Sequence, residues 1–221
     1  VLPLSAPHVA KSRPAQMTSR KTDDQAKCIL KALADDQRSA TDTPARPFID
    51  ALNDPNPRVG LQAVTGLGHL GKVEAAQVLL PRTADADYTV AHIAVQSLRT
   101  LKASEVCLAA LDSADEKSKP GALRVLQALY EPAVIDGLLR RLPAVKGDLR
   151  RGIYTTLCRL DMKEATYTDP KMWWNTRPDT SGPIFKPERW DASDRIEAAL
   201  KEQLAGADVD DGKQFVTSLL R

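Results

Sequence analysis

The sequence DPNPRVGLQAVTGLGHL, Asp54 to Leu70, returns in altered form 31 residues later as DADYTVAHIAVQSLRTL, Asp85 to Leu101. Alignment pairs Asp54 with Asp85, Val59 with Val90, Ala63 with Ala94, Val64 with Val95, Leu67 with Leu98 and Leu70 with Leu101. The same rhythm of small and apolar residues recurs at Ala122, Leu123, Leu126 and Leu129, and again at Ile153, Tyr154, Leu157 and Leu160. A pattern that recurs at a near-constant spacing predicts a repeat architecture.

Shorter apolar segments with helical spacing lie between these copies, at residues 73–80, 104–111 and 133–142. Turn residues that cap helix starts separate the segments, as in Asn53-Asp54-Pro55-Asn56-Pro57, Ala84-Asp85-Ala86-Asp87 and Lys146-Gly147-Asp148. Each unit therefore reads as a helix, a turn and a second helix. Because one such pair cannot bury its own apolar stripe, stacking is required, and the predicted fold is an all-α, right-handed α-solenoid.

Composition and charge exclude several classes of protein. With 43% hydrophobic, 27% charged and only 5% aromatic residues in 221, the chain is neither a disordered tail nor a typical β-sandwich. The net charge of +2 argues against an obligate binder of nucleic acid or of a membrane surface. No stretch approaches the length of a membrane span, and the N-terminus lacks a signal-peptide pattern, so we expect the chain as given to be soluble.

Residues that could ligate a metal or perform catalysis are widely scattered. Cys28, Cys107 and Cys158 form no CxxC or CxxCH spacing, and His69 and His92 occupy different repeat positions. The sequence also has no nucleophile elbow and no phosphate-binding glycine loop. We therefore expect no metal, no cofactor and no enzymatic activity.

Four regions are predicted along the chain. Residues 1–21 form a basic arm or linker that contains three prolines, and residues 22–161 hold the repeats, starting with a helix capped by Thr22 and Gln25. Residues 162–191 lack a helical period and carry all three tryptophans. An ordered loop is expected there, since the tryptophans offer large apolar area to bury. Residues 192–221 form C-terminal helices.

Residues 44–161 resemble HEAT repeats, specifically the short variety of the phycobilisome-lyase-like group, on the helix pairs described above. The resemblance implies a non-catalytic scaffold that contacts a protein partner or adjacent domains of a larger chain. The small all-helical build of the predicted solenoid is also similar to that of HEAT-like DNA glycosylases. A DNA-binding enzyme of that type is therefore the alternative function. That alternative requires a catalytic carboxylate flanked by aromatic residues on a basic face, whereas here the tryptophans crowd into one loop.

The loop carries a second resemblance. Residues 173–183, WWNTRPDTSGP, look like a WW-x-T-R-P-D-T-x-G-P motif from the HEAT region of large secreted bacterial proteins. Those proteins join a dehydrogenase-like β-propeller, HEAT repeats and a c-type cytochrome module. The resemblance implies a periplasmic or otherwise extracytoplasmic location, within a haem-containing redox protein, as a fragment or stand-alone relative of its middle domain. The propeller and the CxxCH haem module are missing from this sequence, so no redox chemistry transfers to its residues.

Eight residues are candidates for an interaction site or a structural cap: Trp173, Trp174, Arg177, Asp179, Lys186, Trp190, Arg150 and Arg151. Tryptophan and arginine are enriched at interface hot spots, but terminal repeats also need a cap over their open end. We expect the loop tryptophans to serve mainly as the cap. Lys186 and the face of Arg150 would then meet the partner. Residues 140–164 carry seven cationic against three acidic side chains, a composition that also suits a solvated face.

Overall fold

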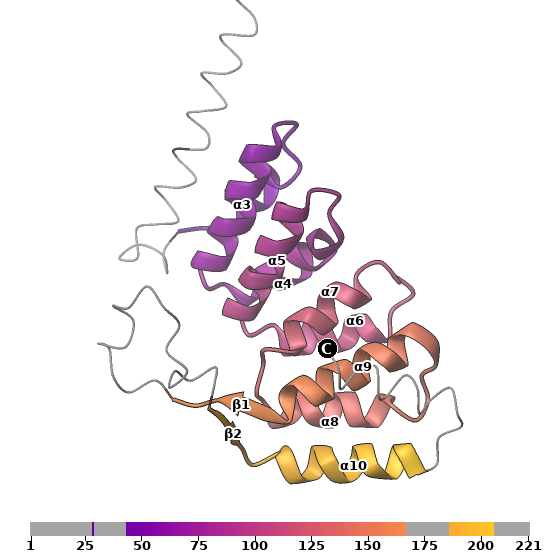
Figure 1. Ribbon diagram of the computed structural model, residues 1–221. Helices are drawn as coiled ribbons and strands as arrows, with labels where there is room; N and C mark the ends of the chain where they lie inside the picture. The colour runs from indigo at the N-terminus through magenta and orange to yellow at the C-terminus, as the bar shows by residue number, and fades with distance from the viewer. Residues whose placement is uncertain (1–27, 29–42, 167–185, 206–221) are drawn as a thin grey trace, which may run out of the picture. The chain divides into compact units, whose positions relative to one another are not determined.

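The computed structural model describes residue 28, residues 43–166 and residues 186–205. The chain divides into two compact units, Val1–Lys72 and Val73–Arg221. Figure 1 labels α3 of the first unit and, in the second, helices α4 to α10 and strands β1 and β2. The predicted arm, the helix expected at 22–34, the tryptophan motif at 173–183 and the last expected helix lie outside the described residues, apart from Cys28.

The described part of the first unit is one helix pair. Helix α2 (Arg46–Ala51) packs on helix α3 (Pro57–His69), and Phe48 of α2 is completely buried. Helix α3 begins as its sequence predicts. The Asn56 side chain accepts a hydrogen bond from the Arg58 amide at 3.0 Å, and Pro57 occupies a position where its missing N–H costs nothing.

The same turn chemistry starts helix α5 (Tyr88–Thr100) of the second unit. Asp85 Oδ1 accepts from the Asp87 amide at 2.9 Å, and Asp87 Oδ1 accepts from the Thr89 amide at 2.8 Å. In the first unit Asp54 Oδ1 accepts from the Asn56 amide at 2.8 Å in the same way. The aligned residues therefore perform the same local task, because Asx side chains bond to the backbone two residues on.

The second unit stacks its helices in two layers. One layer contains α5, α7 (Lys119–Leu126) and α9 (Gly147–Leu160), each packed on the next. The other contains α6 (Ser104–Leu111) packed on α8 (Pro132–Arg141), and α6 also contacts α7. Helix α10 (Ser193–Ala205) follows and packs on α9 (Figure 1). Helices that contact mainly their neighbours along the stack form an α-solenoid.

The repeated leucines confirm the predicted register. Leu67, Leu98, Leu126 and Leu157 each expose 0% of their surface, in α3, α5, α7 and α9 respectively. The periodicity therefore identified the core face of four helices. Among the described helices, none combines the length and the apolar character needed to cross a lipid bilayer.

Residues 73–80 do not form the single helix that the sequence predicts. The segment divides into the 3-10 helix η1 (Val73–Ala75), the short α-helix α4 (Ala76–Leu79) and the 3-10 helix η2 (Leu80–Ala84). Pro81 explains the last break, because a proline has no amide hydrogen for the i to i−4 bond that would continue an α-helix. The segment expected to form one short helix is therefore irregular.

The ends of the region expected to lack secondary structure form a small sheet. Strand β1 (Met162–Glu164) pairs antiparallel with β2 (Pro187–Arg189), with Met162 opposite Arg189. Strands of three residues are too short to show an alternating pattern, so the residue pattern holds no signal for them. The pairing joins the end of α9 to the start of α10.

Candidate functional site

A groove of about 510 Å³ lies between α7 and α9 in the second unit. It is lined by Glu116, Lys119, Pro120, Leu123, Gln127, Asp148, Leu149, Arg151, Gly152 and Thr155. The floor depends on Gly152, because a Cβ there would lie 2.5 Å from Leu123 Cδ1. The missing side chain lets the two helices approach closely below the groove.

Charges of both signs line the rim. Lys119 Nζ lies 2.6 Å from Glu116 Oε1, and Arg151 Nη2 lies 2.6 Å from Asp148 Oδ1. The side chain of Asp148 is 91% exposed and that of Arg151 is 48% exposed. The exposed Arg151–Asp148 pair adds little stability and separates readily, so its groups can exchange one polar partner for another, whereas the Lys119 side chain is only 12% exposed.

The structure gives the two candidates Arg150 and Arg151 different surroundings. Arg151 lines the groove, whereas the Arg150 guanidinium stacks over the Tyr154 ring at 5.6 Å. Arg150 Nε also donates to the Tyr154 hydroxyl at 3.1 Å, and Nη2 reaches Gln203 Oε1 of α10 at 3.5 Å. Of the two, only Arg151 contributes to the groove, while Arg150 connects α9 to α10.

Trp190 lies at the base of the two-stranded sheet and is half-buried. Its Nε1 donates to the Leu160 carbonyl at 2.7 Å, and its ring meets Tyr130 edge to face with centroids 5.6 Å apart. Tyr130 in turn donates to the Met162 carbonyl at 3.1 Å. These contacts fix the sheet against the end of α9, which favours a cap role for this tryptophan.

Of the other loop candidates, Lys186 alone lies within the described residues. Lys186 is exposed immediately before β2. Trp173, Trp174, Arg177 and Asp179 lie outside the described residues, so their roles stay predictions.

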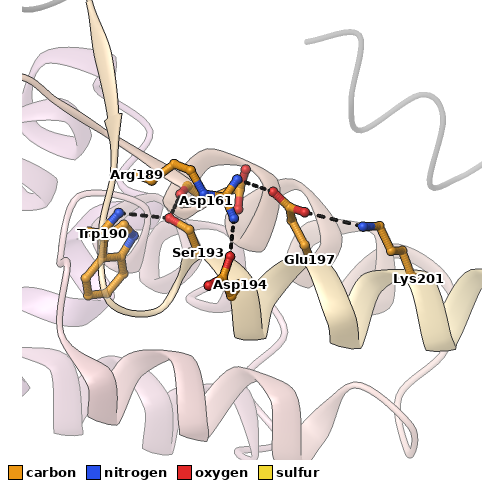
Figure 2. A network of polar contacts seen from close by, with 7 residues as sticks. All are labelled: Asp161, Arg189, Trp190, Ser193, Asp194, Glu197 and Lys201. Atoms are coloured by element: carbon orange, nitrogen blue, oxygen red, sulfur yellow. Dashed lines mark hydrogen bonds and ion pairs between the residues drawn. The ribbon is translucent and has the colours of Figure 1, made fainter.

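A network of charged side chains holds the start of α10, as Figure 2 shows. Arg189 pairs with Asp194 at 2.5 Å and with Glu197, and Lys201 Nζ lies 3.4 Å from Glu197 Oε2. Hydrogen bonds from Arg189 and Lys201 lower the pKa of Glu197. These groups satisfy one another, so the network is structural.

Ser193, which is completely buried, joins this network to α9. Its Oγ donates to the Asp161 carbonyl and accepts from the Trp190 amide, the latter at 3.0 Å (Figure 2). The Asp161 carboxylate is not fully hydrogen-bonded, because its buried Oδ1 has no hydrogen-bond partner among the described residues. Asp161 also follows the last residue of α9, where the helix dipole disfavours a negative charge.

Replacing Asp161 with asparagine is expected to stabilise the protein at neutral pH. Burial raises the pKa of Asp161, and Glu197 raises it further, against the opposing charge of Arg189. Because the folded-state pKa lies above the unfolded value, the free energy of unfolding falls as pH rises through the folded pKa. Asp161→Asn should raise the urea midpoint at pH 7 and reduce its dependence on pH above about 4. Exposed Asp191→Asn is the control, and a lower midpoint for Asp161→Asn would contradict the prediction.

The cysteines and histidines form no reactive site in the described residues. Burial raises the pKa of the Cys107 thiol to about 12 and that of Cys158 to about 11, so both are protonated at neutral pH. Cys28 is exposed, and His92 stacks on Tyr88 with ring centroids 6.2 Å apart. Within the described ranges, no three His, Cys, Asp or Glu side chains gather as they would around a metal ion.

The sequence reasoning did not single out Arg99 and Arg124, which occupy the same place in their helices as Arg159 does in α9. Arg99 and Arg124 lie in the last turns of α5 and α7, as Arg159 does in α9. The sequence signal that could have identified these arginines was a cation in the last turn of each helix of this layer. The 28-residue step between the second and third copies hid it, because Arg99 then aligns with Gln127 and not with Arg124.

A family model described as HEAT repeats matches residues 15–99. No curated protein matches the sequence. One similar solved structure is an engineered protein, 16% identical with a TM-score of 0.36, covering 89% of this chain and 90% of its own. Another is a designed armadillo repeat protein in complex with the peptide (KR)4, 14% identical with a TM-score of 0.37, covering 94% of each chain.

TM-scores of this size do not establish a shared fold. The fold stands on the packing of the described helices, the buried repeat leucines and the family match. On these grounds the chain is an all-α solenoid, and its residues 15–99 are similar to HEAT repeats.

Proposed function

We propose that this protein is a non-catalytic scaffold that binds a segment of a protein partner in the groove between α7 and α9. The groove itself carries the proposal, because its walls are two adjacent helices of a rigid stack and its rim offers exposed polar groups. Repeat stacks present extended surfaces of this kind, and HEAT-type repeats are typical of protein-binding scaffolds.

The residues of the groove suit a peptide backbone with mixed side chains. Gln127 and Thr155 provide neutral polar groups, while Lys119 and Arg151 provide cations that already have exposed anionic partners. Leu123 is buried in the floor. A partner can therefore gain hydrogen bonds along the walls without having to neutralise an isolated buried charge.

The alternative of a DNA glycosylase gains no support from the groove. Its two acidic residues, Glu116 and Asp148, are each paired with a cation. The described lining contains no aromatic residue that could hold an extruded base.

The cellular context is a separate part of the proposal. The motif resemblance at residues 173–183 supports an extracytoplasmic location, within a haem-containing redox protein. Fractionation of the native host with antibodies against this chain tests the location. Recovery in the cytoplasmic fraction alone would rule it out.

Selection of displayed peptides from a random library tests the groove directly. Wild-type protein should enrich a family of peptides. Thr155→Trp, which fills the groove, should weaken their binding at least about tenfold, equivalent to about 1.4 kcal/mol. Ala109→Trp, on exposed α6 surface outside the groove lining, is the matched control and should bind as wild type does.

Two results would reject the groove as the binding site. One is that no peptide family is enriched by the wild-type protein. The other is that the selected peptides bind Thr155→Trp as tightly as wild type. Circular dichroism of each variant establishes that its helices are intact.

A further inference from the structure

Three arginines follow one another across the first layer of the second unit. Arg99 Nη2 donates to the Arg124 carbonyl at 2.6 Å, which joins α5 to α7. Arg124 Nη2 donates to the Thr83 carbonyl at 3.0 Å, which joins α7 to η2. Arg159 occupies the last turn of α9, the next helix of the layer, and is exposed. We call these three side chains the arginine row.

The row lacks anionic partners among the described residues. None of the three guanidinium groups forms an ion pair with a described carboxylate, although several other arginines of the unit do. Arg99 Nε is buried and has no hydrogen-bond partner there either. Partial burial lowers the pKa of Arg99, and the charges of Arg124 and Arg159 lower it further. Like charges held together without a counter-charge create a positive potential that favours an anionic ligand.

The row continues the wall of the groove. On α9, Arg159 follows Gly152 and Thr155 along one face, at helical steps of three and four residues. On α7, Arg124 lies four residues after Pro120 and three before Gln127, which both line the groove, so it shares their side of the helix. A segment lying in the groove can therefore extend past the end of its walls and reach the cations.

We propose that the arginine row binds an acidic segment, rich in aspartate and glutamate, of the protein partner that occupies the groove. This inference rests on the proposed function and adds the chemistry of the partner. Guanidinium groups bind carboxylates through paired hydrogen bonds, and Arg99 and Arg124 have further N–H groups beyond the one each gives to a carbonyl. The partner supplies the negative charge that the described part of the protein does not.

The same surface fits a protein segment better than a nucleic acid. Glu116 and Asp148 lie on the groove rim and would repel a continuous phosphate backbone that followed the groove. Nucleic-acid binding also draws on many cations along one track, whereas this row provides three. A peptide can place its carboxylates at the row alone and neutral residues in the groove.

A labelled peptide, fluorescein-(Gln-Asn)2-(Glu-Asp)2, has a neutral half for the groove and an acidic half for the row, and it tests the proposal on the full chain by fluorescence anisotropy. Arg159→Glu should weaken its binding about tenfold, as expected for loss of a charge-assisted hydrogen bond and introduction of repulsion. Arg140→Glu is the matched control, because Arg140 is an exposed last-turn arginine of α8 in the other layer. That variant changes the net charge equally and should change binding less than about twofold. The neutral peptide (Gln-Asn)4 should bind at least about tenfold more weakly than the acidic one.

Three outcomes overturn the inference. The first is that the acidic peptide does not bind. The second is that Arg159→Glu and Arg140→Glu weaken its binding equally. The third is that a 12-base-pair duplex binds more tightly than the acidic peptide and that Arg159→Glu abolishes this binding. Failure here is distinguishable from failure of the groove proposal. If selected peptides depend on Thr155 yet ignore Arg159, the groove binds a partner whose chemistry is not acidic. If the acidic peptide depends on Arg159 and ignores Thr155→Trp, the row binds without the groove.

Discussion

Truncating Leu126 to alanine is expected to lower the free energy of unfolding by about 2 to 5 kcal/mol, the usual range for a fully buried leucine. Leu126 exposes 0% of its surface, and its helix α7 contacts helices of both layers. Neighbours on several sides cannot all move into the space that the side chain leaves. The loss is therefore transfer free energy plus the cost of a cavity.

Urea unfolding followed by circular dichroism measures this effect. Val73→Ala is the control, since Val73 is 60% exposed and its truncation should cost less than about 0.5 kcal/mol. The equivalent variants Leu98→Ala and Leu157→Ala should show losses in the same range. A loss well below 1 kcal/mol at two of the three positions would mean that the repeat register is wrong.

Replacing Trp190 with alanine is expected to cost about 2 to 4 kcal/mol. The variant loses the hydrogen bond to the Leu160 carbonyl, the edge-to-face contact with Tyr130 and the apolar area of the indole. Trp190 is only half-buried, so the expected loss lies below that of a fully enclosed tryptophan. Its absence should also loosen the connection between α9 and α10, because the sheet and the start of α10 rest on these contacts.

Trp190→Phe separates the two contributions. Phenylalanine keeps an aromatic ring against Tyr130 but cannot donate to Leu160, so its loss should lie near 1 kcal/mol. Both variants should keep their affinity for peptides selected on the groove, measured on the folded protein. If Trp190→Ala instead melts as wild type does and binds those peptides less well, this tryptophan is a contact residue and the cap role fails.

Local features of the sequence were enough to predict the repeats. The spacing of Leu98, Leu126 and Leu157 with their apolar neighbours identifies the buried face of each helix, because a helix returns to the same face every three to four residues. The turn residues Asp85 and Asp87 identify the start of α5, since their side chains bond to amides two residues on. Both signals act over a few residues and do not depend on the rest of the chain.

Tertiary structure alone decided which distant residues meet. Arg99 and Arg124 are 25 residues apart, and Arg124 reaches the Thr83 carbonyl across 41 residues. Gly121 of α7 sits so close to η2 that a Cβ would lie 1.9 Å from Thr83 Oγ1. Neither relation follows from periodicity, because a repeat pattern predicts which face of a helix is buried but not the rotation and spacing of the helix against its neighbour.

Arg150 and Arg151 show the same division between what the sequence predicts and what packing decides. The sequence by itself determined that Arg150 and Arg151 lie side by side on a helix, as adjacent residues of one element must. Packing against α10 then directed Arg150 to Tyr154 and Gln203, while the close approach of α7 and α9 at Gly152 left Arg151 on the groove. Successive residues of a helix point about 100° apart, so neighbours in sequence face different surroundings, which only the assembled helices define.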